Sequence, residues 1–214
     1  MNLDQREIYN RYRTVPEIFG KIKISNRRLN KILRSDLDLS KRENVRDFIL
    51  SYAFFAMIFE GAWFYNGFTP IFALQRRGLM KGTAEQFQYI MRDETLHAAF
   101  GIKTLKTLMQ EENYIPPYEY FALMFEECLK AETDYINYLL PEPILGYNAE
   151  MHIEQYKYIV NRRCRQIGIA EPYADAENVI TWLDEQVNLK KEKNFFESRV
   201  TEYKTNADLD WGDD

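Results

Sequence analysis

Apolar residues along this chain recur mostly three and four positions apart, and no stretch alternates in the manner of a strand. The most apolar run covers residues 48–59 and lies within a predicted helix over about 40–68. This helix is apolar on every side around its centre, so we expect it inside the fold. The run of about twelve residues is shorter than the roughly twenty needed to cross a bilayer, which indicates a core helix and no membrane association.

Local signals at helix ends sharpen the pattern. Capping boxes are predicted at residues 40–43 and 83–86, where a Ser or Thr precedes Glu or Gln by three positions. Pro70 should end or kink the central helix, Asn148 should cap another, and Gly168 should end that one. The expected fold is therefore all-α, a bundle of long helices, with helices at about 5–13, 26–35, 40–68, 83–111, 117–139, 149–167 and 176–187.

The chain is expected to form one domain over residues 1–193, followed by a flexible tail over 194–214. A length of 214 residues is enough for one well-filled core. The end of the chain is mostly polar, with four Asp among its last seven residues, and cannot bury enough surface to order itself. Leu209 and Trp211 stand out in this tail. Such apolar side chains are typical anchors for docking into a groove on another protein.

Composition narrows the function classes and the compartment. The net charge of −5 argues against nucleic acid or an anionic membrane as a partner. Cys128 and Cys164 lie within helical patterns without metal-type spacing, so we expect them to be reduced residues of the core or its boundary. With a polar N-terminus and no signal peptide, these features predict a cytoplasmic protein. An aromatic content of 15% indicates a bulky core and leaves several Tyr for redox work.

The first candidate for chemistry is Glu60, a carboxylate in the most apolar part of the sequence. Burying an unpaired carboxylate costs several kcal/mol, so Glu60 should be paired, protonated or metal-bound. The alternative is an exposed position on a polar side of that helix.

Glu94 and His97 form a Glu-x-x-His pair within the predicted helix over 83–111. Residues three apart share one helix face, so a carboxylate oxygen and an imidazole nitrogen can meet at one metal ion. Such pairs and lone Glu residues are the ligands that helical bundles supply to dinuclear iron or manganese centres. By contrast His152, the other histidine of the chain, has no acid three residues before it and is expected on the surface or at an interface.

Three motifs carry a family resemblance: Phe-Glu-Gly-Ala-Trp-Phe-Tyr at 59–65, Arg-Asp-Glu-Thr-Leu-His at 92–97, and Asn-Phe-Phe-Glu-Ser-Arg-Val-Thr-Glu-Tyr at 194–203. With the acidic, Trp-bearing tail, the chain resembles the second half of the radical-generating small (beta) subunit of class I ribonucleotide reductase, over nearly its whole length. The resemblance implies a ferritin-like helical fold and an oxidoreductase that supports deoxyribonucleotide synthesis for DNA replication. It places Glu60, Glu94 and His97 among the metal ligands.

The same resemblance implies roles for further residues. Asp93 matches the acid on the family's electron-transfer route, and Tyr203 matches the tail tyrosine that passes the radical equivalent to the large subunit. Leu209 and Trp211 lie in the peptide that binds that subunit. The apolar wall that shields the radical is matched by Phe64, Phe68 and Ile90.

Tyr89 bears on the identity of the metals. A Tyr five residues before the metal-binding Glu resembles the activation relay of a subgroup that uses a manganese/iron centre. The alternative is a core aromatic residue. The implied cofactor is therefore a dinuclear centre, which contains either two irons or one manganese and one iron.

Counting ligands shows that the chain holds half of such a site. A complete centre needs two Glu-type ligands and two Glu-x-x-His pairs, whereas this sequence offers Glu60 and the pair of Glu94 and His97. We therefore expect a separate N-terminal half of the small subunit, a truncated product, or a homo-oligomer in which two copies complete the site.

The leading hypothesis is the C-terminal portion of a ribonucleoside-diphosphate reductase small subunit that works with the large subunit. Two alternatives remain: a non-catalytic module that binds the large subunit, and a homodimeric ferritin-like di-metal oxidase.

Overall fold

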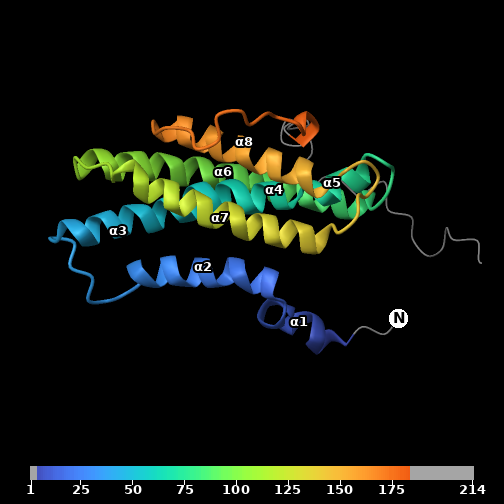
Figure 1. Cartoon of the computed structure of the whole chain (residues 1–214), viewed down its shortest axis with the longest axis horizontal. Coiled ribbons are helices and arrows are strands. Elements are labelled where there is room, and N and C mark those ends of the chain that lie inside the picture. Colours follow the sequence, from blue (N-terminus) through green and yellow to red (C-terminus); the bar gives the residue numbers. More distant parts are fainter. Residues whose placement is uncertain (1–3, 184–214) are drawn as a thin grey trace, which may run out of the picture.

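A computed structural model describes residues 4–183, in which all regular secondary structure is helical (Figure 1). An isolated bridge between Ile144 and Tyr147 is the one β-type pairing in this range. The all-α prediction is confirmed, while the predicted tail over 194–214 lies outside the described residues. The helices are α1 (Gln5–Thr14), α2 (Pro16–Ile32), α3 (Arg42–Ala53), the π-helix η1 (Phe54–Phe64), α4 (Tyr65–Gly67), α5 (Thr69–Gln75), α6 (Lys81–Glu111), α7 (Tyr118–Leu139) and α8 (Ala149–Ile167).

The central element is η1, which contacts α6, α8, α3, α2 and α7. In Figure 1 the long helices run along the same axis, with α8 on one side of the bundle and α2 on the other, against α7. Phe54, Met57 and Ile58 of η1 are fully buried. The apolar run therefore forms the middle of the core, as its composition predicts.

The predicted helix over 40–68 is helical from Arg42 to Gly67, but its middle is a π-helix that the sequence pattern did not indicate. In a π-helix each N–H bonds the carbonyl five residues earlier, and such turns are frequent at functional sites. The helix is interrupted at Phe68, directly before Thr69 and Pro70, as predicted. Pro70 lies in the first turn of α5, where a missing N–H costs nothing.

Several predicted helix starts are wrong. α2 begins at Pro16 rather than near residue 26, because Pro suits the first helical turn. Neither capping box forms: the Ser40 hydroxyl donates to Asp38 at 2.6 Å, and α3 begins after Lys41 with no side-chain cap. The box at 83–86 lies inside α6, which begins after Met80 in the left-handed conformation.

At the C-terminal end of the described range the outcome is mixed. Asn148 caps α8 by accepting a hydrogen bond from the amide of Met151, and Gly168 ends the helix with a φ of 82°, both as predicted. Of the helix expected over 176–187, residues 176–180 are not helical and 181–183 are, while the rest lies outside the described residues.

Among residues 4–183, one helical run, Arg42–Gln75, is long and apolar enough to span a membrane, with a mean hydropathy of 1.4 in its best window. However, 67% of that window is buried within the structure. The central helix of a helical bundle has a similar length and hydropathy, since neighbouring helices cover its apolar surface.

A buried polar network joins α2, α7 and α8, and it corrects the prediction for His152. This residue is fully buried rather than at the surface: its Nε2 lies 2.6 Å from Glu132 Oε1 and its Nδ1 lies 2.5 Å from the Tyr147 hydroxyl. Glu132 also accepts a hydrogen bond from Lys21 Nζ at 2.6 Å. Because each buried polar group has a partner, the network is compatible with burial.

Cys128 and Cys164 are both free, as predicted, and of the two expected positions, core or boundary, both occupy the core. Burial raises the pKa of each thiol to about 12, with Arg28 acting against the shift at Cys128 and Glu171 adding to it at Cys164. Both side chains therefore stay protonated and belong to the core.

Close contact between α6 and η1 depends on Gly101. A Cβ at this position would lie 2.8 Å from the Cβ of Ala56, which is too close. We expect Gly101→Ala to lower the free energy of unfolding by about 1–2 kcal/mol, since overpacking outweighs the gain in helix propensity. Urea denaturation followed by circular dichroism measures the change, and an equally or more stable variant would contradict the prediction.

Candidate metal centre

Glu60, Glu94 and His97 meet at the surface between η1 and α6. One ligand atom from each lies within 4.8 Å of the others. Glu94 and His97 are one turn apart on α6, and Glu94 Oε2 lies 3.3 Å from His97 Nδ1. The structure thus brings together the three residues that the sequence selected as metal ligands.

The Glu60 carboxyl is perturbed by its burial and by the neighbouring Glu94. Partial burial raises the pKa of Glu60 to about 7; the hydrogen bond and negative charge of Glu94 add to this rise, and His97 opposes it. Two carboxylates in one site cannot both ionise without cost. A divalent cation between them would remove that repulsion, which is the electrostatic property expected of a metal site.

The face that carries these residues is open. The His97 side chain is 63% exposed, whereas that of Glu94 is 13% exposed. Apolar residues stand beside them without cover: Phe100 is 70% exposed, and Phe64 and Ile90 are also exposed. Large exposed apolar surface of this kind usually marks an interaction face.

The three residues predicted to form an apolar wall differ in solvent exposure. Phe68 is buried, whereas Phe64 and Ile90 lie on the open face. Phe64 packs between Phe59 and Phe68, with ring centroids 5.2 and 6.3 Å away. These rings line a cavity of about 280 Å³ whose wall also includes Trp63 and Lys21. An aromatic cluster thus includes Phe59, the residue before Glu60, and one of its rings, Phe64, is exposed.

Other predicted site residues lie outside the cluster of three. Asp93 is exposed on α6 and is not part of it. Tyr89 is half-buried, with the Arg92 guanidinium 5.8 Å from its ring centre. Tyr203, Leu209 and Trp211 lie outside the described residues.

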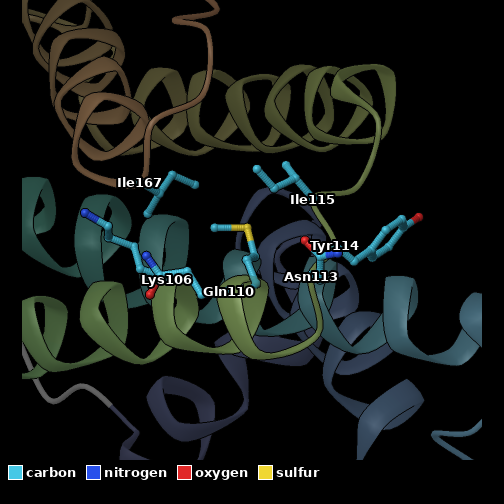
Figure 2. A pocket seen from close by; sticks show the side chains of 7 residues that line it. Lys106, Gln110, Asn113, Tyr114, Ile115 and Ile167 are labelled. Carbon is cyan, nitrogen blue, oxygen red and sulfur yellow. The ribbon is translucent and has the colours of Figure 1, made fainter.

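A larger cavity, of about 480 Å³, lies toward the C-terminal end of α6 (Figure 2). Figure 2 shows Lys106 and Gln110 of α6 facing Ile167 of α8 across it. Its lining includes no carboxylate, and Lys106 lies nine residues, or roughly 13 Å of helix, beyond His97. This cavity is therefore separate from the candidate metal centre and lacks metal ligands.

Comparison with known proteins places the chain in a family. Residues 1–179 match the family model for the ribonucleotide reductase small chain. The chain belongs to the ribonucleotide reductase small-chain family. It is 34% identical over 214 residues to the ribonucleoside-diphosphate reductase subunit beta of Chlamydia pneumoniae, covering 99% of this chain and 62% of that protein. It is 33% identical over 146 residues to the small chain of variola virus, covering 67% of this chain and 43% of that protein.

Solved structures of ribonucleotide reductases share the fold. A putative class I ribonucleotide reductase from Bacillus halodurans superposes with a TM-score of 0.74 at 23% identity, covering 85% of this chain and 64% of that one. The ribonucleotide reductase R2 subunit from Clostridium botulinum gives 0.70 at 25% identity, covering 85% and 56%. The ferritin-like fold is thus confirmed. The chain spans less than two thirds of the length of these relatives.

Small chains of ribonucleotide reductase carry a dinuclear metal centre and work with a large subunit. The donors present here fit such a centre, since carboxylate oxygens suit manganese and imidazole nitrogen suits iron. Their number fits one half of it, because a full centre needs a further lone acid and a second Glu-x-x-His pair. Both histidines of the sequence are accounted for, one in the cluster and one in the buried network.

The backbone geometry that presents Glu60 was not predictable from the sequence pattern. The residue projects from a π-turn, and the carbonyl of the next residue, Gly61, accepts a hydrogen bond from Arg163 Nε of α8 at 3.0 Å. Gly61, directly after the ligand, indicates that another group approaches the backbone closely. That group is Arg163, about a hundred residues away in the chain, so the sequence does not identify it.

Proposed function

We propose that this chain is the C-terminal part of a ribonucleoside-diphosphate reductase small subunit and supplies half of the ligands for its dinuclear metal centre. The observation that carries the proposal is the cluster of Glu60, Glu94 and His97 on an open apolar face. When bound, the centre supplies the one-electron oxidising power used in deoxyribonucleotide synthesis. Either two irons or manganese with iron would suit the donors, and a cytoplasmic location is part of the proposal.

The remaining ligands would come from residues outside this sequence, on the same polypeptide or on another. A segment that covers Phe64, Ile90 and Phe100 would bring its own acids to Glu60 and His97 and exclude water from the site. Exposed apolar side chains around a polar cluster support this arrangement, because their burial would stabilise the assembly by roughly 25 cal/mol per Å² of apolar surface.

Other residues would connect the centre to a large subunit. In this proposal Asp93 and Tyr89 serve electron transfer, Tyr203 passes the radical equivalent onward, and Leu209 and Trp211 dock the tail. Asp93 and Tyr89 share α6 with two of the ligands, and Asp93 directly precedes Glu94, which supports this assignment.

Metal binding by the chain tests the proposal. Titration with Mn²⁺, followed by loss of the EPR signal of free Mn²⁺, should show one ion per chain, and Glu94→Gln should weaken binding at least tenfold. Glu111→Gln is the matched control, because Glu111 is an exposed acid at the far end of the same helix. Wild-type binding that is absent, or unchanged in Glu94→Gln, would contradict the proposal.

Activity separates the proposed function from its alternatives. A polypeptide that supplies the second Glu-x-x-His pair, mixed with this chain, iron, manganese, oxygen and a large subunit, should form deoxynucleotides. Binding to the large subunit without activity in any mixture would instead support a non-catalytic module. A homodimer that consumes oxygen without a large subunit would support the di-metal oxidase.

A further inference from the structure

Arg163 of α8 extends into the core beside the segment that presents Glu60. It is 6% exposed, and its Nε donates to the carbonyl of Gly61 at 3.0 Å. Its Nη1 donates to Gln166 at 3.2 Å, and its guanidinium carbon lies 5.7 Å from the ring centre of Tyr65. A buried guanidinium is stable only where acceptors and ring faces surround it, so this environment is specific for arginine.

The contact with Gly61 requires glycine at that position. A Cβ there would lie 2.6 Å from the carbonyl oxygen of Ala56 and 3.0 Å from Arg163 Nε. The first contact arises because the π-turn brings residue 61 close to the residue five positions earlier. The second shows that the arginine side chain fills the space that a larger residue would occupy.

Glu60 directly precedes Gly61, so a hydrogen bond to the Gly61 carbonyl restrains the π-helix backbone one residue beyond the Cα that bears the carboxylate. Arg163 approaches from α8, whereas Glu94 and His97 belong to α6. The π-segment is thus held by a hydrogen bond from one neighbouring helix while it presents a ligand toward another.

We propose that Arg163 is a positioning residue for Glu60: through the Gly61 carbonyl it holds the π-turn in the register that places the Glu60 carboxylate opposite Glu94 and His97. This inference rests on the proposed metal-binding function and deepens it. Partners that orient a ligand without touching the metal typically change metal affinity by 10–100-fold when removed.

The test compares Mn²⁺ affinity in the full 214-residue chain, by EPR of free Mn²⁺, at a temperature where circular dichroism shows every variant folded. Arg163→Met keeps much of the side chain's length but removes the donor, and we expect about tenfold weaker binding. Arg165→Met is the matched control: it removes a cation from the same helix, where Arg165 pairs with Glu171 at 2.7 Å, and should leave affinity unchanged. If Arg163→Met does not fold, Arg163→Lys, which lacks the Nε donor, is expected to show the same weakening.

A second control separates positioning from general loss of stability. Ile159→Ala removes a fully buried core side chain of α8 and should destabilise the fold while leaving Mn²⁺ affinity within about twofold of wild type. Equal affinity of wild type and Arg163→Met would overturn this inference alone, as would equal losses in Arg163→Met and Ile159→Ala. Absence of Mn²⁺ binding by the wild type would overturn the proposed metal centre and this inference with it.

Discussion

Replacing Lys21 with Met is expected to lower the free energy of unfolding by about 3 kcal/mol at neutral pH. The Lys21 side chain is 17% exposed and that of Glu132 is 1% exposed, so the substitution leaves a carboxylate buried without its cation. It also removes the ammonium from between the rings of Trp63 and Tyr135, whose centres lie 4.6 and 4.5 Å away. Urea denaturation followed by circular dichroism measures the loss.

The pH dependence of this loss identifies its cause. Burial acts to raise the pKa of Glu132, but Lys21 and His152 outweigh it and hold the pKa below its ordinary value of 4.5. In the wild type the network's contribution is therefore full above about pH 4.5 and is lost as the pH falls through the lowered folded-state pKa. In Lys21→Met the pKa of Glu132 rises, so as the pH falls the buried carboxylate is protonated, and its unpaired charge removed, in the variant before the wild type. The difference in free energy of unfolding between wild type and Lys21→Met should therefore narrow from pH 7 to pH 4.

A matched control is Lys31→Met on the same helix. Lys31 is exposed and pairs with Asp47 at 3.3 Å, so its loss should cost less than about 1 kcal/mol. Restoring neutrality in the double variant Lys21→Met, Glu132→Gln should recover part of the stability. A Lys21→Met protein as stable as Lys31→Met at pH 7 would show that the buried network contributes little.

Gly61→Ala should have the next largest effect, a loss of about 2–3 kcal/mol in the free energy of unfolding. The added methyl would lie 2.6 Å from the Ala56 carbonyl oxygen, a backbone atom that can move only if the π-turn changes. The same substitution should weaken Mn²⁺ binding, because Glu60 moves with that turn. Chemical denaturation and the Mn²⁺ titration measure the two effects separately.

The control for this substitution is Gly20→Ala in α2. A Cβ at residue 20 meets nothing within 4 Å, so the variant should be more stable by about 0.5–1 kcal/mol through reduced chain entropy. If both glycine substitutions stabilise the protein to the same degree, the tight contact at Gly61 does not constrain the fold.

The sequence predicted the helices whose apolar period and end signals agree. The helix expected over 117–139 is Tyr118–Leu139, and that over 149–167 is Ala149–Ile167, capped by Asn148. The box at 40–43 failed because Asp38 competes for the Ser40 hydroxyl, a contact that no three-residue spacing reveals. The π-helix was not predicted because a continuous apolar run has no periodicity that distinguishes a π-helix from an α-helix.

The candidate ligands were found because Glu94 and His97 are local on one helix and Glu60 is conspicuous in an apolar run. His152 was misplaced for the opposite reason. Its partners Glu132 and Lys21 come from other helices, so its burial is decided by tertiary contacts. Likewise, Arg163 resembles its charged neighbours Arg162 and Arg165 in the sequence, and only the packing of α8 on η1 distinguishes it.

The π-turn also changes how insertions and deletions act in this part of the chain. Aromatic residues in η1 pack at intervals of four and five, instead of three and four: Phe55 stacks on Phe59, and Phe59 packs at a tilt against Phe64. We expect a deletion of one residue between positions 54 and 64 to convert the segment to an α-helix. Every later side chain of the helix would then point in a different direction around the helix axis, relative to α6. The function of this segment therefore depends on its exact length as well as on its residues.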